Sequence, residues 1–181
     1  SEFSGYLNYQ YTGNRIIIEP GFRIQSYADV GVSPEPRIGL KYIATDALRL
    51  KLAGGMYSQN ILSTVSDRDV VNLFTGIISS PEEIPNQENG DPYPTKFQKA
   101  RHLIGGIEFD FSRNIDFQIE GYIKDFTQLT NIDRYETSPN LSDQFIIETG
   151  IAKGIDMLVK YKNKQLYIWA VYSLGFVKRD D

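Results

Sequence analysis

Hydrophobic and polar residues alternate with a period of two along most of this chain. The pattern is clearest at residues 48–52 and 115–120, where every second side chain is apolar and those between are charged or carry an amide. Because successive side chains of a β-strand point to opposite faces, this pattern predicts strands that separate two different environments. Eight strands are predicted, at residues 4–11, 15–27, 37–44, 48–57, 101–111, 115–125, 145–161 and 165–177.

The lengths of the predicted connections alternate along the chain. Those at 12–14, 45–47, 112–114 and 162–164 are short and rich in turn-forming residues, whereas those at 28–36, 58–100 and 126–144 are long. Short turns at one end and long external loops at the other are typical of outer-membrane barrels. The sequence therefore predicts an all-β fold. It is an antiparallel up-and-down meander of about eight strands in one region, residues 1–181, forming part of a transmembrane β-barrel.

The two faces of the predicted strands differ in polarity. One face is apolar, whereas the other carries charges of both signs, among them Lys41, Glu108, Asp156 and Lys160. A narrow dry core could hold so many charges only at a large cost in desolvation free energy. The polar face is therefore predicted to line a wide aqueous lumen, and the apolar face to meet outer-membrane lipid.

Two positions depart from this pattern. Pro20 lies inside a predicted strand, and because proline has no N–H to donate, a bulge or an edge position is expected there. Lys153 falls on the apolar face of its strand, so a break in strand register is expected around residues 152–154.

Composition narrows the possible functions. The formal net charge is −4 and the basic residues are dispersed, so no nucleic-acid partner is expected. The chain has no cysteine and no stretch of about 20 mainly apolar residues that could form a transmembrane helix. No cofactor or metal is expected. A catalytic triad around the only histidine, His102, is less favoured than an ordinary strand residue near the loop end, so the chain is not expected to be an enzyme.

Several segments together resemble one known family. They are Glu-Pro-Gly-Phe-Arg-Ile at 19–24, Pro-Arg-Ile-Gly-Leu-Lys-Tyr at 36–42, Thr-Asp-Ala-Leu-Arg-Leu-Lys at 45–51, Gly-Gly-Met-Tyr-Ser-Gln at 54–59, Tyr-Ile-Lys-Asp-Phe at 122–126, Glu-Thr-Gly-Ile-Ala-Lys-Gly-Ile-Asp at 148–156 and Leu-Tyr-Ile-Trp-Ala-Val-Tyr-Ser at 166–173. In this order they resemble TonB-dependent outer-membrane receptors of the Bacteroidetes type, over nearly the whole chain.

The resemblance implies a barrel with 22 strands, closed by an N-terminal plug, in the outer membrane of a Gram-negative bacterium. Such a receptor takes up a siderophore, haem, cobalamin or an oligosaccharide with energy from a periplasmic TonB partner. The sequence contains neither a plug nor a TonB-contact motif, and it ends at 178–181 without a terminal aromatic residue. We therefore expect an internal fragment of the C-terminal barrel. Its open edges and apolar face would make it self-associate when isolated.

Candidate ligand contacts lie in the predicted external loops. They are Asp67, Arg68, Asp69, Phe74, Tyr93 and Tyr135. Charged and aromatic side chains at the mouth of a receptor could bind a polar nutrient, although a solvated charge run and an interfacial aromatic girdle are the simpler interpretations.

Two other functions remain open from the sequence. One is a complete small barrel of eight strands with a structural or adhesive role. The other is a soluble all-β binding module, in which a second sheet would cover the apolar face.

Overall fold

The computed structural model describes residues 2–28, 30–63, 77–79, 84–87, 90–132 and 145–180. The strands in this part of the chain are β1 (Glu2–Asn8), β2 (Tyr11–Thr12), β3 (Ile16–Tyr27), β4 (Gly31–Ile43), β5 (Leu48–Gln59), β6 (Ile61–Ser63), β7 (Ile77–Ser79), β8 (Gln98–Ser112), β9 (Ile115–Ile132), β10 (Phe145–Lys162) and β11 (Tyr167–Asp180). None of the described residues belongs to a helix long and apolar enough to cross a membrane.

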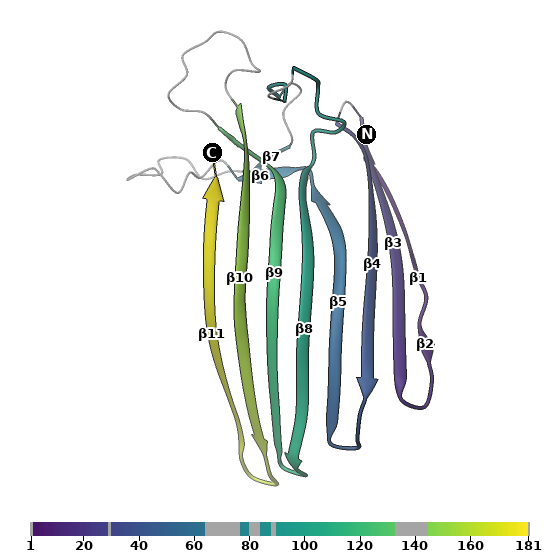
Figure 1. Cartoon of the computed structure of the whole chain (residues 1–181), viewed down its shortest axis with the longest axis vertical. Helices are drawn as coiled ribbons and strands as arrows, with labels where there is room; N and C mark the ends of the chain where they lie inside the picture. The colour runs from purple at the N-terminus through teal and green to yellow at the C-terminus, as the bar shows by residue number, and fades with distance from the viewer. Residues whose placement is uncertain are drawn as a thin grey trace.

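The long strands form one antiparallel sheet in the order β1-β3-β4-β5-β8-β9-β10-β11, with β2 also paired to β3. Each long strand lies beside the next one along the chain, and Figure 1 shows them side by side in a single layer. β1 and β2 pair with β3 in the same register, so they act as one interrupted strand. The predicted all-β meander of about eight strands is therefore confirmed. β6 and β7 form a separate hairpin at the loop end.

The four connections predicted to be short, at 12–14, 45–47, 112–114 and 162–164, all lie at the same end of the sheet (Figure 1). Between β4 and β5, the Ala44 N–H donates to the Leu48 carbonyl at 2.9 Å. Between β10 and β11, the Asn163 side-chain oxygen accepts the N–H groups of Gln165 and Leu166, both at 2.8 Å. Asparagine favours tight turns because its side chain can satisfy backbone N–H groups in this way. Local residue chemistry thus stabilises these turns.

The connection between β3 and β4 is shorter than predicted. β4 begins at Gly31, so residues 31–36 are strand and the predicted long loop at 28–36 is wrong. Two prolines, Pro34 and Pro36, made this segment look like a loop. Their ladder partners lie on β3, whereas the ladder to β5 ends at Arg37. The prolines therefore remove no hydrogen bond from the β5 side.

The other long loops are also shorter than expected. β9 continues to Ile132, so the segment from residue 126 to residue 132 is strand and not loop. β5 and β8 extend to Gln59 and from Gln98. The strands therefore reach further beyond the apolar band than periodicity alone indicated.

Pro20 interrupts the neighbouring edge strand and leaves its own strand continuous. The Tyr9 N–H donates to the Pro20 carbonyl at 3.0 Å, but Pro20 has no N–H to return to Tyr9. The β1–β3 ladder is therefore lost at residues 9 and 10, between Asn8 and Tyr11, without any change of register. On the other side Pro20 pairs normally with Ile38. The expected bulge is absent, and the missing donor faces the edge of the sheet.

The register break in β10 lies closer to the loops than predicted. Pairing between β9 and β10 shifts between Glu148 and Gly150, whereas residues 152–154 pair regularly. Lys153 is on the same face as Ile151 and Ile155, so it is a basic residue within the apolar face.

The sheet buries almost no apolar side chains. Among the described residues only Val30 and Phe97 are buried hydrophobic residues, while large apolar side chains are exposed on every long strand. The alternate, polar side chains of each strand point to the opposite side of the sheet. One layer of sheet with an uncovered apolar face and a charged face is the arrangement expected of a wall between lipid and water.

Candidate functional site

The polar face of the sheet, here called the inner face, carries two clusters of charged residues. The turn-side cluster comprises Lys41, Arg49, Lys51, Glu108, Asp110 and Glu120. The loop-side cluster comprises Arg23, Glu35, Arg37, Tyr57, Ser58 and His102. The members of each cluster come from adjacent strands, and Ser58 joins the loop-side cluster through its hydrogen bond to Glu35.

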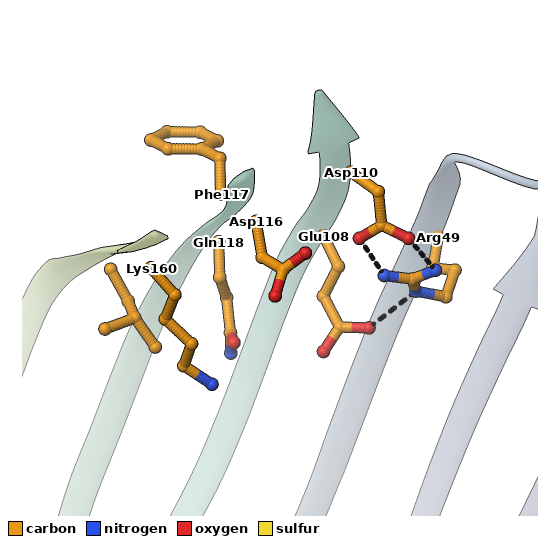
Figure 2. Close-up of a pocket in the computed structure, with 8 residues that line it drawn as sticks. Arg49, Glu108, Asp110, Asp116, Phe117, Gln118 and Lys160 are labelled. Carbon is orange, nitrogen blue, oxygen red and sulfur yellow. Dashed lines mark hydrogen bonds and ion pairs between the residues drawn. The ribbon is translucent and has the colours of Figure 1, made fainter. Parts of the chain in front are cut away.

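Arg49 organises the turn-side cluster. Its Nη1 and Nη2 donate to the two Asp110 carboxylate oxygens at 2.7 and 2.5 Å, and its Nε donates to Glu108 at 3.0 Å. Figure 2 shows the guanidinium between the two carboxylates. This two-pronged geometry matches the planar fork of arginine to a carboxylate, which fixes both side chains.

Glu108 is the acidic centre of the same cluster. It pairs with Lys41 at 3.0 Å and also with Lys51 and Arg49, so three cations surround one carboxylate. Lys51 approaches Glu120 as well, at 3.8 Å. The charges compensate one another across four strands. The main role of the cluster is therefore structural, since its ion pairs connect neighbouring strands.

A cavity of about 340 Å³ adjoins this cluster. Besides Arg49, Glu108 and Asp110, it is lined by Asp116 and Lys160, which face each other across β9 and β10. Figure 2 shows these side chains directed to the same side of the sheet. The cavity is polar and open to the inner face.

The loop-side cluster is built around a buried carboxylate. Glu35 is only 1% exposed and accepts hydrogen bonds from Arg37 at 2.5 Å and from the Ser58 hydroxyl at 2.6 Å. Arg23 lies 3.7 Å from the same carboxylate. Two arginines around one buried acid leave cationic groups at the surface of the cluster.

Aromatic groups extend the loop-side cluster toward β8. The Tyr57 and His102 rings stack with centroids 4.3 Å apart, and the Arg37 guanidinium lies 4.4 Å from the Tyr57 ring centroid. Lys124 pairs with His102 in the β8–β9 ladder. The arrangement is an aromatic platform bordered by positive charges. It can bind a ligand that carries a ring or an anionic group.

A second cavity, of about 230 Å³, lies beside this platform. Its lining includes Tyr57, His102, Phe126 and Lys99. The segment just before β8 is anchored nearby, because the Gln128 amide donates to the Thr95 carbonyl at 2.9 Å. The platform is thus held close to the described end of the longest connection.

Of the ligand contacts predicted from the sequence, one lies within the described residues. Asp67, Arg68, Asp69, Phe74 and Tyr135 lie outside the described residues. Tyr93 is half-buried in the segment before β8 and lines none of the described cavities given above. The candidates therefore remain predictions.

Sequence reasoning missed the loop-side cluster. Glu35 and Arg37 alternate with Pro34 and Pro36, so the period of two was present in the segment assigned to a loop. His102 is a strand residue near the loop end, as predicted, and it stacks on Tyr57. Among the described residues no group of three or more acidic or histidine side chains is placed to hold a metal ion.

Comparisons with known proteins support the fold alone. No family model and no curated protein sequence matches the chain. Among solved structures, 98% of the chain matches a chain of the RagAB peptide importer in its closed-closed state, with a TM-score of 0.60 and 14% identity. The NanC porin matches over 97% of this chain and 78% of its own, with a TM-score of 0.39 and 11% identity, which is too low to support an argument.

The chain spans 22% of the length of the importer chain that it matches. The importer is an outer-membrane β-barrel protein. Together with the single-layer meander, this similarity shows that the chain has the fold of an outer-membrane barrel wall.

Proposed function

We propose that the chain forms part of the wall of a TonB-dependent outer-membrane importer, with its long connections facing the outside. The observation that carries this proposal is the opposition of an uncovered apolar face and an inner face with charges of both signs. A lipid-facing barrel with an aqueous interior accommodates both faces. The proposal also rests on the resemblance to TonB-dependent receptors, which implies that the plug and the TonB contact belong to other parts of the receptor.

The loop-side cluster is the part of the inner face best suited to meet an incoming ligand. It lies at the loop end of the strands, and it combines the Tyr57–His102 stack with the guanidinium of Arg37. Siderophores, haem and cobalamin carry rings or anionic groups, and oligosaccharides also stack on aromatic side chains. A peptide joins these candidates because the RagAB protein is a peptide importer. Its carboxylate groups would pair with arginine.

The two alternative functions are less well supported. The strand order runs from β1 to β11 without pairing between these two strands, so the described sheet does not close into a small barrel. No second sheet covers the apolar face within the part of the chain that the structure describes, as a soluble binding module would require. A wall segment of a larger barrel needs neither closure of this sheet on itself nor a second sheet over its apolar face.

Uptake measurements test this function. The natural protein that contains these residues is produced in the outer membrane of cells with and without an active TonB system. Uptake is measured with a labelled ferric siderophore, haem, cobalamin, a maltooligosaccharide and an oligopeptide. We expect uptake of one of these probes to require TonB. Uptake of every probe at the same rate without TonB would contradict the proposal and favour a passive or structural barrel.

A pair of tyrosine variants tests the role of the platform. Tyr57→Ala removes the ring that stacks on His102, whereas Tyr172→Ala removes a ring on the outer face of β11. Loss of one aromatic contact, worth about 1 kcal/mol, should weaken ligand binding about fivefold in Tyr57→Ala and leave Tyr172→Ala unchanged. Equal affinities of the two variants would show that the ligand does not use the platform.

A further inference from the structure

A furrow of about 510 Å³ lies on the apolar outer face across β8, β9 and β10, between Leu52 of β5 and Leu174 of β11. Its apolar walls are Leu103, Ile123, Ile155 and Leu174, and Phe176 stands beside Lys153 at the loop side. The furrow lies on the face opposite to the two charged clusters. It is therefore separate from the proposed ligand route.

Two paired glycines make the floor of the furrow. Gly105 of β8 lies opposite Gly121 of β9, so two adjacent outward positions have no side chain. The space above them is open. A Cβ atom added to Gly121 would have its nearest neighbour at 3.9 Å, and one added to Gly105 would have its nearest at 3.8 Å. The glycines are not required by backbone crowding, and their effect is to leave a hollow in an otherwise continuous apolar surface.

Lys153 is the cationic residue in the lining of this furrow. It lies between Ile151 and Ile155 on the outer face, and no described acidic side chain pairs with it. An unpaired lysine on the lipid face of a barrel costs about 2–4 kcal/mol at the middle of the membrane and less near the interface. A phosphate at the interface would compensate the charge.

The position of Lys153 along the strand agrees with an interfacial depth. Eight residues separate it from Tyr161, the last outward residue before the turn. At a rise of about 3.3 Å per residue and a tilt of about 40°, this corresponds to about 20 Å across the membrane. An apolar band of an outer-membrane barrel is about 25 Å tall. Lys153 therefore lies near the loop-side, external edge of the band, where its long side chain can reach the headgroups.

We infer that this furrow is a binding site for an anionic, phosphate-bearing lipid of the external leaflet. One acyl chain lies over Gly105 and Gly121, and the ammonium group of Lys153 pairs with the lipid phosphate. The charge and the hollow are adjacent in one lining, so a single amphiphile satisfies both. This inference needs only that the apolar face meets the membrane, and it does not depend on which ligand is imported.

Lipid binding to the purified natural protein in detergent tests the site. Native mass spectrometry measures the affinity for diphosphorylated lipid A, with phosphatidylcholine as a zwitterionic comparison and inorganic phosphate as a headgroup comparison. Lys153→Gln should weaken lipid A binding about tenfold, because one charged hydrogen bond is lost. Lys164→Gln removes the same charge in the β10–β11 turn and should leave the affinity unchanged.

Filling the furrow tests the acyl part of the site. Gly121→Val places a side chain in the hollow, with its Cβ 3.9 Å from the nearest backbone atom, and it should reduce lipid A binding to the level of phosphatidylcholine. Gly105→Val serves the same purpose if the first variant does not fold, as judged by the β-sheet circular dichroism spectrum. Unchanged lipid A affinity in the folded valine variants or in Lys153→Gln would overturn the inference. Full displacement of lipid A by inorganic phosphate would also overturn it, because a free-anion site would then explain the binding.

Discussion

Gly154 is the glycine whose replacement should damage this sheet most clearly. A Cβ atom added to Gly154 would lie 2.5 Å from the Leu174 carbonyl oxygen and 2.6 Å from the Tyr122 hydroxyl oxygen. The Tyr122 ring lies across Gly154, and its hydroxyl also approaches the position that a Cβ of Gly175 would take, at 3.1 Å. A tyrosine side chain can move away, but the backbone carbonyl of β11 can move only if the strand shifts. Gly154→Ala therefore forces β10 and β11 apart.

The loss of stability in Gly154→Ala can be estimated from packing and compared with that of a glycine in open space. Inserting one methyl group where no space exists costs about 1–3 kcal/mol, and contact with backbone places Gly154→Ala at the upper end of this range. Gly121 lies in the adjacent strand β9, one residue from the Tyr122 that packs on Gly154, and its added Cβ would meet nothing closer than 3.9 Å. Gly121→Ala should therefore stabilise the sheet by about 0.5–1 kcal/mol, because alanine restricts the unfolded chain.

Urea unfolding in detergent, followed by the fluorescence of the single tryptophan Trp169 in β11, measures both effects. With a urea dependence of about 2 kcal/mol per M, we expect the midpoint of Gly154→Ala to fall by about 1.5 M. Combining Gly154→Ala with Tyr122→Ala should recover only part of the loss, because the carbonyl contact remains. Equal midpoints for Gly154→Ala and Gly121→Ala would refute the role of glycine in the close approach of β10 and β11.

Three further predictions concern the charged clusters and the interrupted strand. Glu35→Ala should lower the free energy of unfolding by about 2 kcal/mol, measured by the same urea assay, because Arg37 loses its buried partner; a loss no larger than that of a surface substitution would contradict this. Glu108→Ala should cost about 1 kcal/mol at low salt and less at high salt, since the cations around it then repel one another, and a salt-independent loss would exclude that cause. Pro20→Val restores a donor toward Tyr9, so the amide of residue 20 should become protected in hydrogen exchange, whereas rapid exchange there would show that the β1–β2 break has another origin.

The strand meander could be predicted from the sequence because its faces meet two different environments. Most outward positions are apolar and most inward positions are polar, so the period of two survives even though the described sheet has almost no buried apolar core. The boundaries were harder to predict where proline occurs. Pro34 and Pro36 indicate a loop in isolation, and only the end of the β4–β5 ladder at Arg37 explains why they are tolerated in a strand.

The loop-side cluster could not be predicted because it depends on long-range pairing. Glu35 and Ser58 are 23 residues apart, and they meet only because β4 and β5 extend beyond the last regular pair of their ladder. Tyr57 and His102 similarly require the β5–β8 pairing across the longest connection. Residue type alone favoured the loops as the ligand site, because charged and aromatic residues are frequent there. The described aromatic and cationic groups that lie together are on strands.

The same residue type serves opposite purposes on the two faces of this sheet, and strand parity decides which. Gly154 and Gly175 point inward, where the space left by their missing side chains is filled by the ring of Tyr122 from the same chain. Gly105 and Gly121 point outward, where no side chain of the described residues fills the space. An intrinsic loss of strand stability at each glycine is thus offset inside by tyrosine packing. Outside, the inferred lipid would fill the same kind of space from the surroundings of the sheet.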